Sequence, residues 1–204
     1  MGSNECHVTS HWRVLGTPEE VFEIIAKAAD LPRWWPAAFR DSLPIQTGDE
    51  TGTARVVRLE SRGFLPYVLR WHVVTKSVDR PHHLVNEVWG DIQGVIVWTL
   101  AADGDYTTVD SDWRISIHMP LLGLLSPIVN PFYSANHRWA MAKGEESLKL
   151  ELQRLRAASQ AARSQVAQPP AGVERSTWAI ALGAGALLAL LMLRRDAKKG
   201  ERGT

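Results

Sequence analysis

The chain has 204 residues, of which 45% are apolar and 22% charged, as expected of a soluble globular domain with room for an appendage. The net charge of +1 excludes the overall basic field of a nucleic-acid-binding protein, and the single cysteine, Cys6, excludes an internal disulfide and a thiolate metal cluster. Nine tryptophans are the one anomaly, and eight of them precede residue 140. They indicate either a core filled with indoles or a cavity walled by them.

The N-terminal part of the chain predicts a strand followed by a short helix. The first sixteen residues contain no apolar run of signal-peptide length and no basic region, so we expect no export signal. Alternation over Val8–Leu15 predicts a first strand. A helix is then expected from Thr17 to about Ala29, because Thr17 is a good N-cap, Pro18 suits the first helical position and Glu20 completes a capping box.

A second helical turn is expected over Leu31–Trp35, where Pro36 stops it. Trp34 and Trp35 are adjacent, and adjacent side chains on a helix point about 100° apart. We therefore expect only one of these two indoles to enter the core and the other to lie near the rim of an opening.

The region from Phe39 to His118 predicts an antiparallel meander. Short segments with strand character alternate with Gly, Asp and Pro turns of hairpin size. In the last segment Trp113 and Ile115 share the face expected to point inward, while Asp110 and Asp112 share the outer face. The two carboxylates are thus interpreted as an outward charge ladder rather than a catalytic pair. The six expected strands are 39–46, 53–61, 66–78, 84–89, 94–101 and 107–118.

A long helix is expected after these strands, from Pro127 or Pro131 to about Gln165, with Gly144 as the only break in its sequence. Apolar and aromatic residues recur along it at intervals of three, four and seven, which is typical of one buried helical face. The arrangement predicts an α+β fold in which a curved antiparallel sheet of about seven strands wraps around this helix. The face comprises Tyr133, His137, Met141, Leu148, Leu152 and Leu155.

Three segments carry a resemblance to a known family: residues 16–36 (GTPEEVFEIIAKAADLPRWWP), 70–100 and 124–148. With their order of elements, they resemble the START/polyketide-cyclase superfamily (SRPBCC, the helix-grip fold), over about residues 7–156. The last segment is similar to a bacterial subgroup described as polyketide cyclase/dehydrase or lipid transport. The resemblance implies a deep cavity between sheet and long helix that binds lipids, sterols or polyketides.

Candidate ligand-binding residues follow from the inward faces of the predicted strands and of the first half of the long helix. His137 could contact a ligand headgroup or act as a general acid/base with Tyr133 as its partner, or it could be a core histidine satisfied by the protein itself. We expect no metal site at His7, His11 or His82-His83, and no cofactor. The ligand-binding candidates are Trp35, Trp71, Trp98, Trp113, Ile115, Tyr133, Asn136, His137 and Met141.

The C-terminal region predicts a membrane anchor. Residues 177–193 form an uncharged run of roughly 25 Å as a helix, close to the ~30 Å hydrocarbon core of a bilayer. Trp178 and the flanking arginines suit the membrane interface. The expected organisation is a ligand-binding domain (7–156), a helix extension and linker (157–175), a single-pass transmembrane helix (176–195) and a basic tail (196–204).

Topology and function remain open at this point. The five basic residues after the span favour a cytoplasmic tail, whereas the absent signal sequence favours a cytoplasmic globular domain, which we prefer. The first hypothesis is a membrane-tethered protein that binds, and could transport, a lipid-like or other hydrophobic molecule. The second is a cyclase or dehydratase acting on a polyketide-like substrate, with His137 as acid/base. The third is a ligand-free, membrane-anchored interaction or stress-response protein.

Overall fold

The computed structural model describes residues 5–64, 67–117 and 126–173, with the backbone alone for 126–132. The chain divides into two compact units, Met1–Gly172 and Val173–Thr204, and the fold below is that of the first. Within the described ranges, no helix is both long and apolar enough to cross a bilayer. The predicted span at 177–193 lies outside these ranges.

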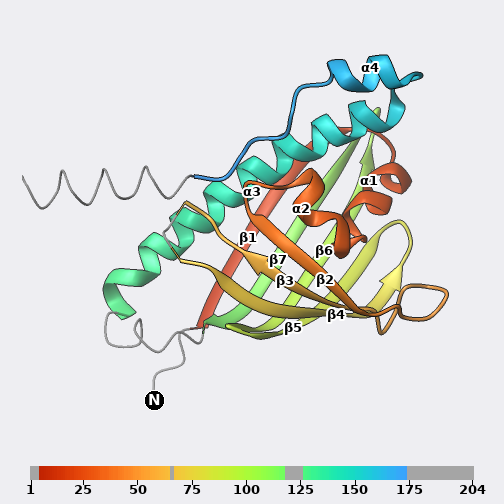
Figure 1. Ribbon diagram of the computed structural model, residues 1–204. Helices are drawn as coiled ribbons and strands as arrows, with labels where there is room; N and C mark the ends of the chain where they lie inside the picture. The colour runs from red at the N-terminus through yellow and green to blue at the C-terminus, as the bar shows by residue number, and fades with distance from the viewer. Residues whose placement is uncertain (1–4, 65–66, 118–125, 174–204) are drawn as a thin grey trace, which may run out of the picture. The chain divides into compact units, whose positions relative to one another are not determined.

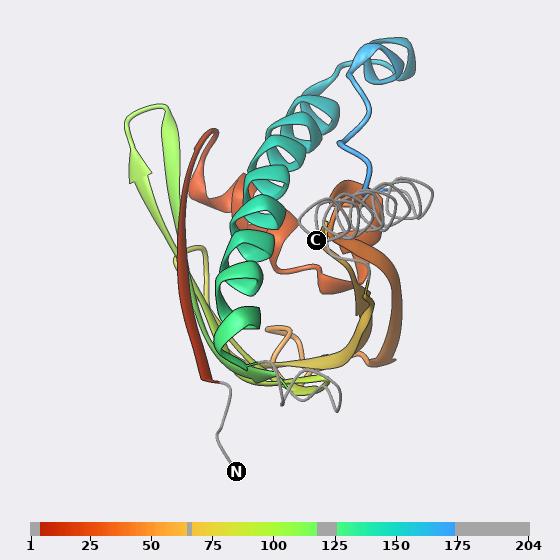
Figure 2. The same cartoon turned by 90° about the vertical axis from the view of Figure 1, so that its left-hand side faces the viewer.

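Seven strands form one antiparallel sheet in the order β1-β7-β6-β5-β4-β3-β2. The sheet curves strongly, so that its concave face encloses the long helix α3 (Figures 1 and 2). This confirms the predicted α+β architecture of a curved sheet around a long helix. The strands are β1 (Glu5–Leu15), β2 (Phe39–Gln46), β3 (Val56–Ser61), β4 (Leu69–Asp79), β5 (His83–Gly90), β6 (Ile92–Asp103) and β7 (Tyr106–Ile117).

Alternation along the strands separates the two faces of the sheet as predicted. In β7, Trp113 and Ile115 are buried and Asp110 is exposed. In β6, where the sequence left the choice open, Trp98 is buried, whereas Val95 is 39% exposed. The concave face is therefore aromatic and aliphatic, which is what allows a helix to pack into it.

Two short helices close one end of the sheet. Helix α1 (Pro18–Ile25) begins with the predicted capping box, in which the Thr17 hydroxyl accepts a hydrogen bond from the Glu20 backbone N–H and the Glu20 carboxylate accepts one from the Thr17 backbone N–H. It ends four residues before the expected Ala29, and a 3-10 turn η1 (Ala28–Asp30) leads into α2 (Leu31–Trp34).

The prediction that only one of the adjacent indoles would be buried is wrong. Trp34 and Trp35 are 1% and 2% exposed, and their ring centroids lie 5.5 Å apart. The reason is that α2 has only four residues, and Trp35 is its C-cap with φ −126° and ψ 56°. Because Trp35 has left the helix, the 100° rule no longer sets its direction, and both rings reach the core.

Helix α3 (Ser126–Arg156) ends earlier than expected, and a separate helix α4 (Gln160–Gln165) follows. The Ser159 side chain accepts a hydrogen bond from the backbone of Ala162 (3.2 Å), which starts a new helix rather than continuing the old one. Leu155, expected on the buried face, is 56% exposed. In this last turn it is Arg156 that contacts α1, through a 2.9 Å hydrogen bond from Nε to Glu20.

Residues 166–172, which we call the strap, run back from α4 beside α3 (Figures 1 and 2). Arg154 Nη2 donates a 3.0 Å hydrogen bond to the Ala167 carbonyl near the start of the strap. At its far end Gly172 lies against the domain, where a β-carbon would be 3.2 Å from the Ala37 carbonyl oxygen and 3.5 Å from Arg62 Nη2.

Candidate functional site

The interior between the sheet and α3 is organised around a closed circuit of six aromatic rings. Five indoles and one phenyl ring contact one another in sequence, with centroid separations of 5.1–6.5 Å. Such edge-to-face and tilted contacts are favourable arrangements for aromatic rings. In order around the circuit, the rings are Trp35, Trp12, Trp98, Trp113, Trp71 and Phe39.

Helix α3 reaches this circuit through Gly144. A β-carbon at Gly144 would lie 2.4 Å from a ring carbon of Trp35 and 2.9 Å from one of Trp12, so no other residue fits without displacing an indole. Trp35 also anchors the helix directly, since its Nε1 donates a 3.1 Å hydrogen bond to the Ala140 carbonyl. The residue that looked like a break in the helix is thus where helix and aromatic circuit meet.

The first of two interior cavities, which we call the tryptophan cavity, has a volume of about 40 Å³. Its walls are almost wholly apolar, with Asn86 as the one side chain that carries an amide. The residues that line it are Ile25, Ala28, Leu31, Trp34, Trp35, Phe39, Leu59, Trp71, Val73, Asn86, Ile96, Trp98 and Trp113.

The second, which we call the helix cavity, has a volume of about 70 Å³ and lies against the first half of α3. It is lined by more polar side chains than the tryptophan cavity, and four aromatic residues (Trp35, Phe39, Trp71 and Trp113) line both cavities. Its other lining residues are Ala38, Ser61, Arg62, Gly63, Leu69, Ile92, Tyr133, Asn136, His137, Ala140 and Met141.

Eight of the nine predicted ligand-binding residues line these cavities. Trp98 lines only the tryptophan cavity; Tyr133, Asn136, His137 and Met141 line only the helix cavity; Trp35, Trp71 and Trp113 line both. Ile115 is buried but lines neither. The structure places these residues at the cavity walls, and their contact with a ligand stays a prediction.

Burial sets the protonation of the two polar aromatic side chains on α3. It lowers the pKa of His137 to about 4, so the imidazole is neutral at pH 7. It raises the pKa of Tyr133 well above its usual range, so the phenol keeps its proton. Among the described residues that line either cavity, none is acidic.

The charged residues considered in the sequence lie on the other face of the sheet. His7 Nε2 is 3.0 Å from Asp112, and His11 Nδ1 is 2.7 Å from Asp110, across the pairing of β1 with β7. These four side chains are between 31% and 61% exposed. In the part of the chain that the structure describes, no group of three or more His, Cys, Asp or Glu side chains could hold a metal ion.

Sequence reasoning missed several wall residues. Trp34 was set aside because it adjoins Trp35, although it lines the tryptophan cavity. Arg62 and Gly63 looked like an ordinary turn but line the helix cavity, where Gly63 packs so closely on Asn136 that a β-carbon would lie 2.0 Å from Oδ1. The available signal in the sequence was Gly63 itself, because a residue without a β-carbon allows another chain segment to approach closely.

Comparison with known proteins identifies relatives of this fold. The sequence profile of a family described as polyketide cyclase / dehydrase and lipid transport matches residues 5–160. No curated protein matches the chain significantly. Three solved structures share 15–17% sequence identity with the chain, a level at which the likeness shows the fold alone.

The first is a START superfamily protein from Mycobacterium smegmatis (15% identity, TM-score 0.58, 73% of this chain and 98% of that chain). The second comes from Thermus thermophilus (17% identity, TM-score 0.57, 76% of this chain and 100% of that chain). The third is the Zhui aromatase/cyclase from Streptomyces sp. R1128 (15% identity, TM-score 0.60, 76% of this chain and 98% of that chain).

Proposed function

Because this chain belongs to the polyketide cyclase / dehydrase and lipid transport family, we propose that it binds a hydrophobic small molecule between its curved sheet and α3. The observation that carries the proposal is the interior itself, where five indoles and a phenyl ring form a closed circuit and four of these six rings line both cavities. Each 100 Å² of apolar ligand surface buried there contributes about 2.5 kcal/mol.

Binding requires the interior to open. Cavities of about 40 and 70 Å³ are well below the roughly 300–1,000 Å³ of typical ligand sites. Trp35, Phe39, Trp71 and Trp113 line both spaces, so a ligand larger than either cavity has to displace some of these rings. We therefore propose that the structure is the closed form of the domain.

Co-purification tests this function. The full-length protein, purified in detergent, is measured by native mass spectrometry and its bound molecules are then extracted into organic solvent and identified. We expect a mass increment that is lost on extraction, and uptake of apolar probes by the extracted protein. Finding neither a bound molecule nor uptake of a probe would contradict the proposal.

Membrane tethering is a second part of the proposal, and it rests on the sequence of residues 177–193 together with the strap. The strap ends at Gly172 beside Arg62, which lines the helix cavity. The predicted span begins five residues later in the sequence. A membrane tether there would keep the domain at the bilayer that supplies its ligand.

For the topology we propose the cytoplasmic globular domain that we preferred on the sequence. Reporter fusions at both termini test this directly. At the N-terminus we expect activity from a reporter that works only in the cytoplasm, and none from a reporter that works only outside it. An N-terminal reporter found outside would show that the basic residues after the span decide the orientation.

Two other functions have one observation each in their favour. A cyclase or dehydratase is favoured by His137, whose neutral imidazole lines the helix cavity and could take up a proton. A His137→Ala variant with full turnover on a polyketide substrate would remove that mechanism. A ligand-free interaction protein is favoured by the small cavities, and the co-purification experiment separates it from a binding protein.

A further inference from the structure

Two polar atoms from residues that line the helix cavity have no hydrogen-bond partner among the residues that the structure describes. They are the indole Nε1 of Trp113, on β7, and the imidazole Nε2 of His137, on α3. The two residues are 8% and 7% exposed, and their ring centroids lie 5.2 Å apart at an angle of 72°. Buried polar groups are nearly always paired, so unpaired atoms on two neighbouring side chains that line one cavity point to a partner that the described residues do not supply.

The chemistry of the two atoms defines that partner. The indole nitrogen can only donate a hydrogen bond. The neutral imidazole Nε2 accepts in one tautomer and donates in the other. A hydroxyl group has one donor and two lone pairs, so it can accept from Trp113 and pair with His137 in either tautomer. A carbonyl oxygen can pair with both atoms only when Nε2 carries the proton.

A charged group fits this position less well than a neutral one. None of the described lining residues of the helix cavity is acidic, and Arg62 is its one guanidinium. Arg62 lies beside the strap at Gly172 and is already engaged in an interaction of its own. A carboxylate between Trp113 and His137 would lose its hydration, and neither of these two neutral side chains supplies a positive charge, which is unfavourable.

We propose that the helix cavity is the subsite for a neutral hydroxyl group on an otherwise apolar ligand, an alcohol or a phenol, with Trp113 donating to its oxygen and His137 completing the pair. The inference rests on the proposed binding function and narrows it to a ligand class. The apolar body of the ligand then extends past the shared rings toward the tryptophan cavity, where the walls are indoles and aliphatic side chains.

Phenol and toluene form the matched pair of probes, because a methyl group replaces the hydroxyl with little change in size, and benzoate supplies the anionic counterpart. Each is titrated into the full-length protein in detergent micelles, and the indole ¹⁵N–¹H resonance of Trp113 is followed by NMR. We expect phenol to bind about tenfold more tightly than toluene, as two modest hydrogen bonds would give, and to move the Trp113 resonance downfield.

Three variants locate the effect. His137→Phe and Trp113→Phe each remove one of the two polar atoms, and each should reduce the preference for phenol over toluene to about threefold or less. Trp89→Phe is the matched control, since Trp89 is 40% exposed and lines neither cavity. It should keep the tenfold preference.

The outcomes separate this inference from the function on which it rests. Equal binding of phenol and toluene to the wild-type protein, tighter binding of benzoate, or an unchanged preference in His137→Phe would overturn the hydroxyl subsite and leave the binding function standing. Binding of none of the three probes would overturn both. The comparison in the wild-type protein needs no variant, so it decides the question even if a substitution prevents folding.

Discussion

At the scale of single residues, His137 ties the candidate site to stability. Its pKa is lowered by burial to about 4 in the folded protein and returns to its usual value near 6.5 when the chain unfolds. Between these values the unfolded state binds more protons, so the free energy of unfolding falls as the pH is lowered from 6.5 toward 4. The stabilisation is fully present above pH 6.5.

A His137→Phe variant should lack this pH dependence. Between pH 7 and pH 4.5 we expect the wild-type protein to lose about 2 kcal/mol more of its unfolding free energy than the variant. Urea denaturation of both proteins at the two pH values measures the difference. Parallel losses in wild type and variant would mean that His137 is not buried in its neutral form.

Gly144 is the second residue that can be tested alone. In most helices Gly→Ala is stabilising by up to about 1 kcal/mol, but here the added carbon would lie 2.4 Å from Trp35. We expect Gly144→Ala to lower the free energy of unfolding by about 1–3 kcal/mol. Ala142→Gly, an exposed position on the same helix, reports the ordinary propensity cost. A Gly144→Ala protein more stable than wild type would contradict the packing of α3 on the aromatic circuit.

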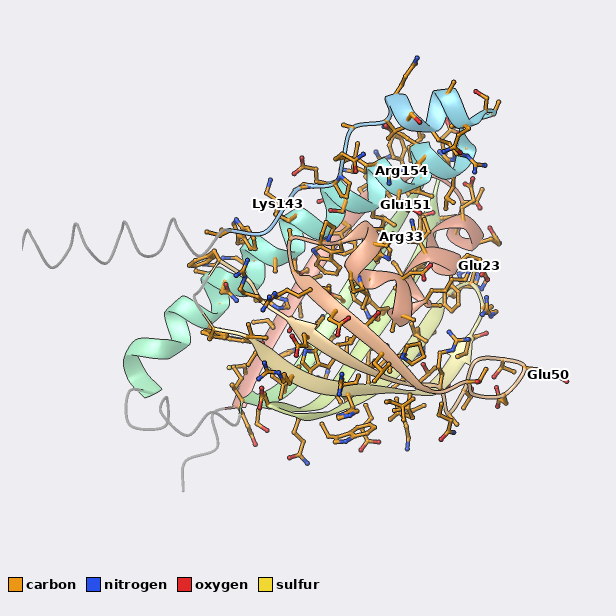
Figure 3. All side chains as sticks on the ribbon, in the orientation of Figure 1. Glu23, Arg33, Glu50, Lys143, Glu151 and Arg154 are labelled. Atoms are coloured by element: carbon orange, nitrogen blue, oxygen red, sulfur yellow. The ribbon has the colours of Figure 1, made fainter. Side chains whose placement is uncertain are left out.

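At the scale of elements, a buried carboxylate joins α2 to α3. The side chain of Glu151 has no exposed surface, and it accepts hydrogen bonds from Arg33 Nη1 (2.6 Å) and Arg154 Nη1 (2.8 Å). Figure 3 shows the three side chains pointing toward one another. Arg33 immediately precedes Trp34 and Trp35, which both line the tryptophan cavity. The ion pair between Arg33 and Glu151 therefore holds this segment in place.

Replacing Glu151 by Gln should destabilise the protein by about 1–3 kcal/mol, less than a fully buried pair because Arg33 is 53% exposed and screened by water. Glu146→Gln is the control, since Glu146 pairs with Lys143 at the surface and should matter little. Thermal unfolding followed by near-ultraviolet circular dichroism, which reports tryptophan packing, measures both. Equal effects of the two substitutions would refute the role of Glu151.

Much of the element order could be predicted from sequence, because alternation and helical periodicity are local signals. The inward set of β7 and the capping box of α1 are examples. Three features depend on contacts that periodicity does not carry. They are the direction of Trp35 as a C-cap, the end of α3, beyond which Ser159 caps a new helix, and the pairing of Glu151 with an arginine 118 positions away.

For the candidate site, too, the sequence predicted what local alternation determines and not what depends on contacts between distant residues. Inward-facing aromatic residues could be named from alternation, and most of them line a cavity. The cavity volumes could not be foreseen, because they depend on how the indoles pack against one another and on the space that Gly144 gives them. The unpaired atoms of Trp113 and His137 are likewise visible only in three dimensions.

At the scale of the whole molecule, the proposed membrane tether depends on the predicted span. An arginine near the centre of a span costs about 2.5–3.5 kcal/mol on insertion scales. We expect Leu187→Arg to move much of the protein from a carbonate-washed membrane fraction into the supernatant, whereas Leu187→Phe should remain in the membrane. Equal membrane fractions for both variants would contradict an anchor at 177–193.

The central claim is that the interior of the helix-grip domain takes up a hydrophobic molecule, and two methionines test it in one measurement. Met141 is 3% exposed and lines the helix cavity, whereas Met192 lies in the predicted span. Full-length protein with ¹³C-labelled methionine methyl groups is titrated with toluene in micelles. We predict a saturable shift of the Met141 methyl signal and nuclear Overhauser contacts from Met141 to the probe. A response of Met192 alone, with Met141 unchanged at saturation, would contradict the claim.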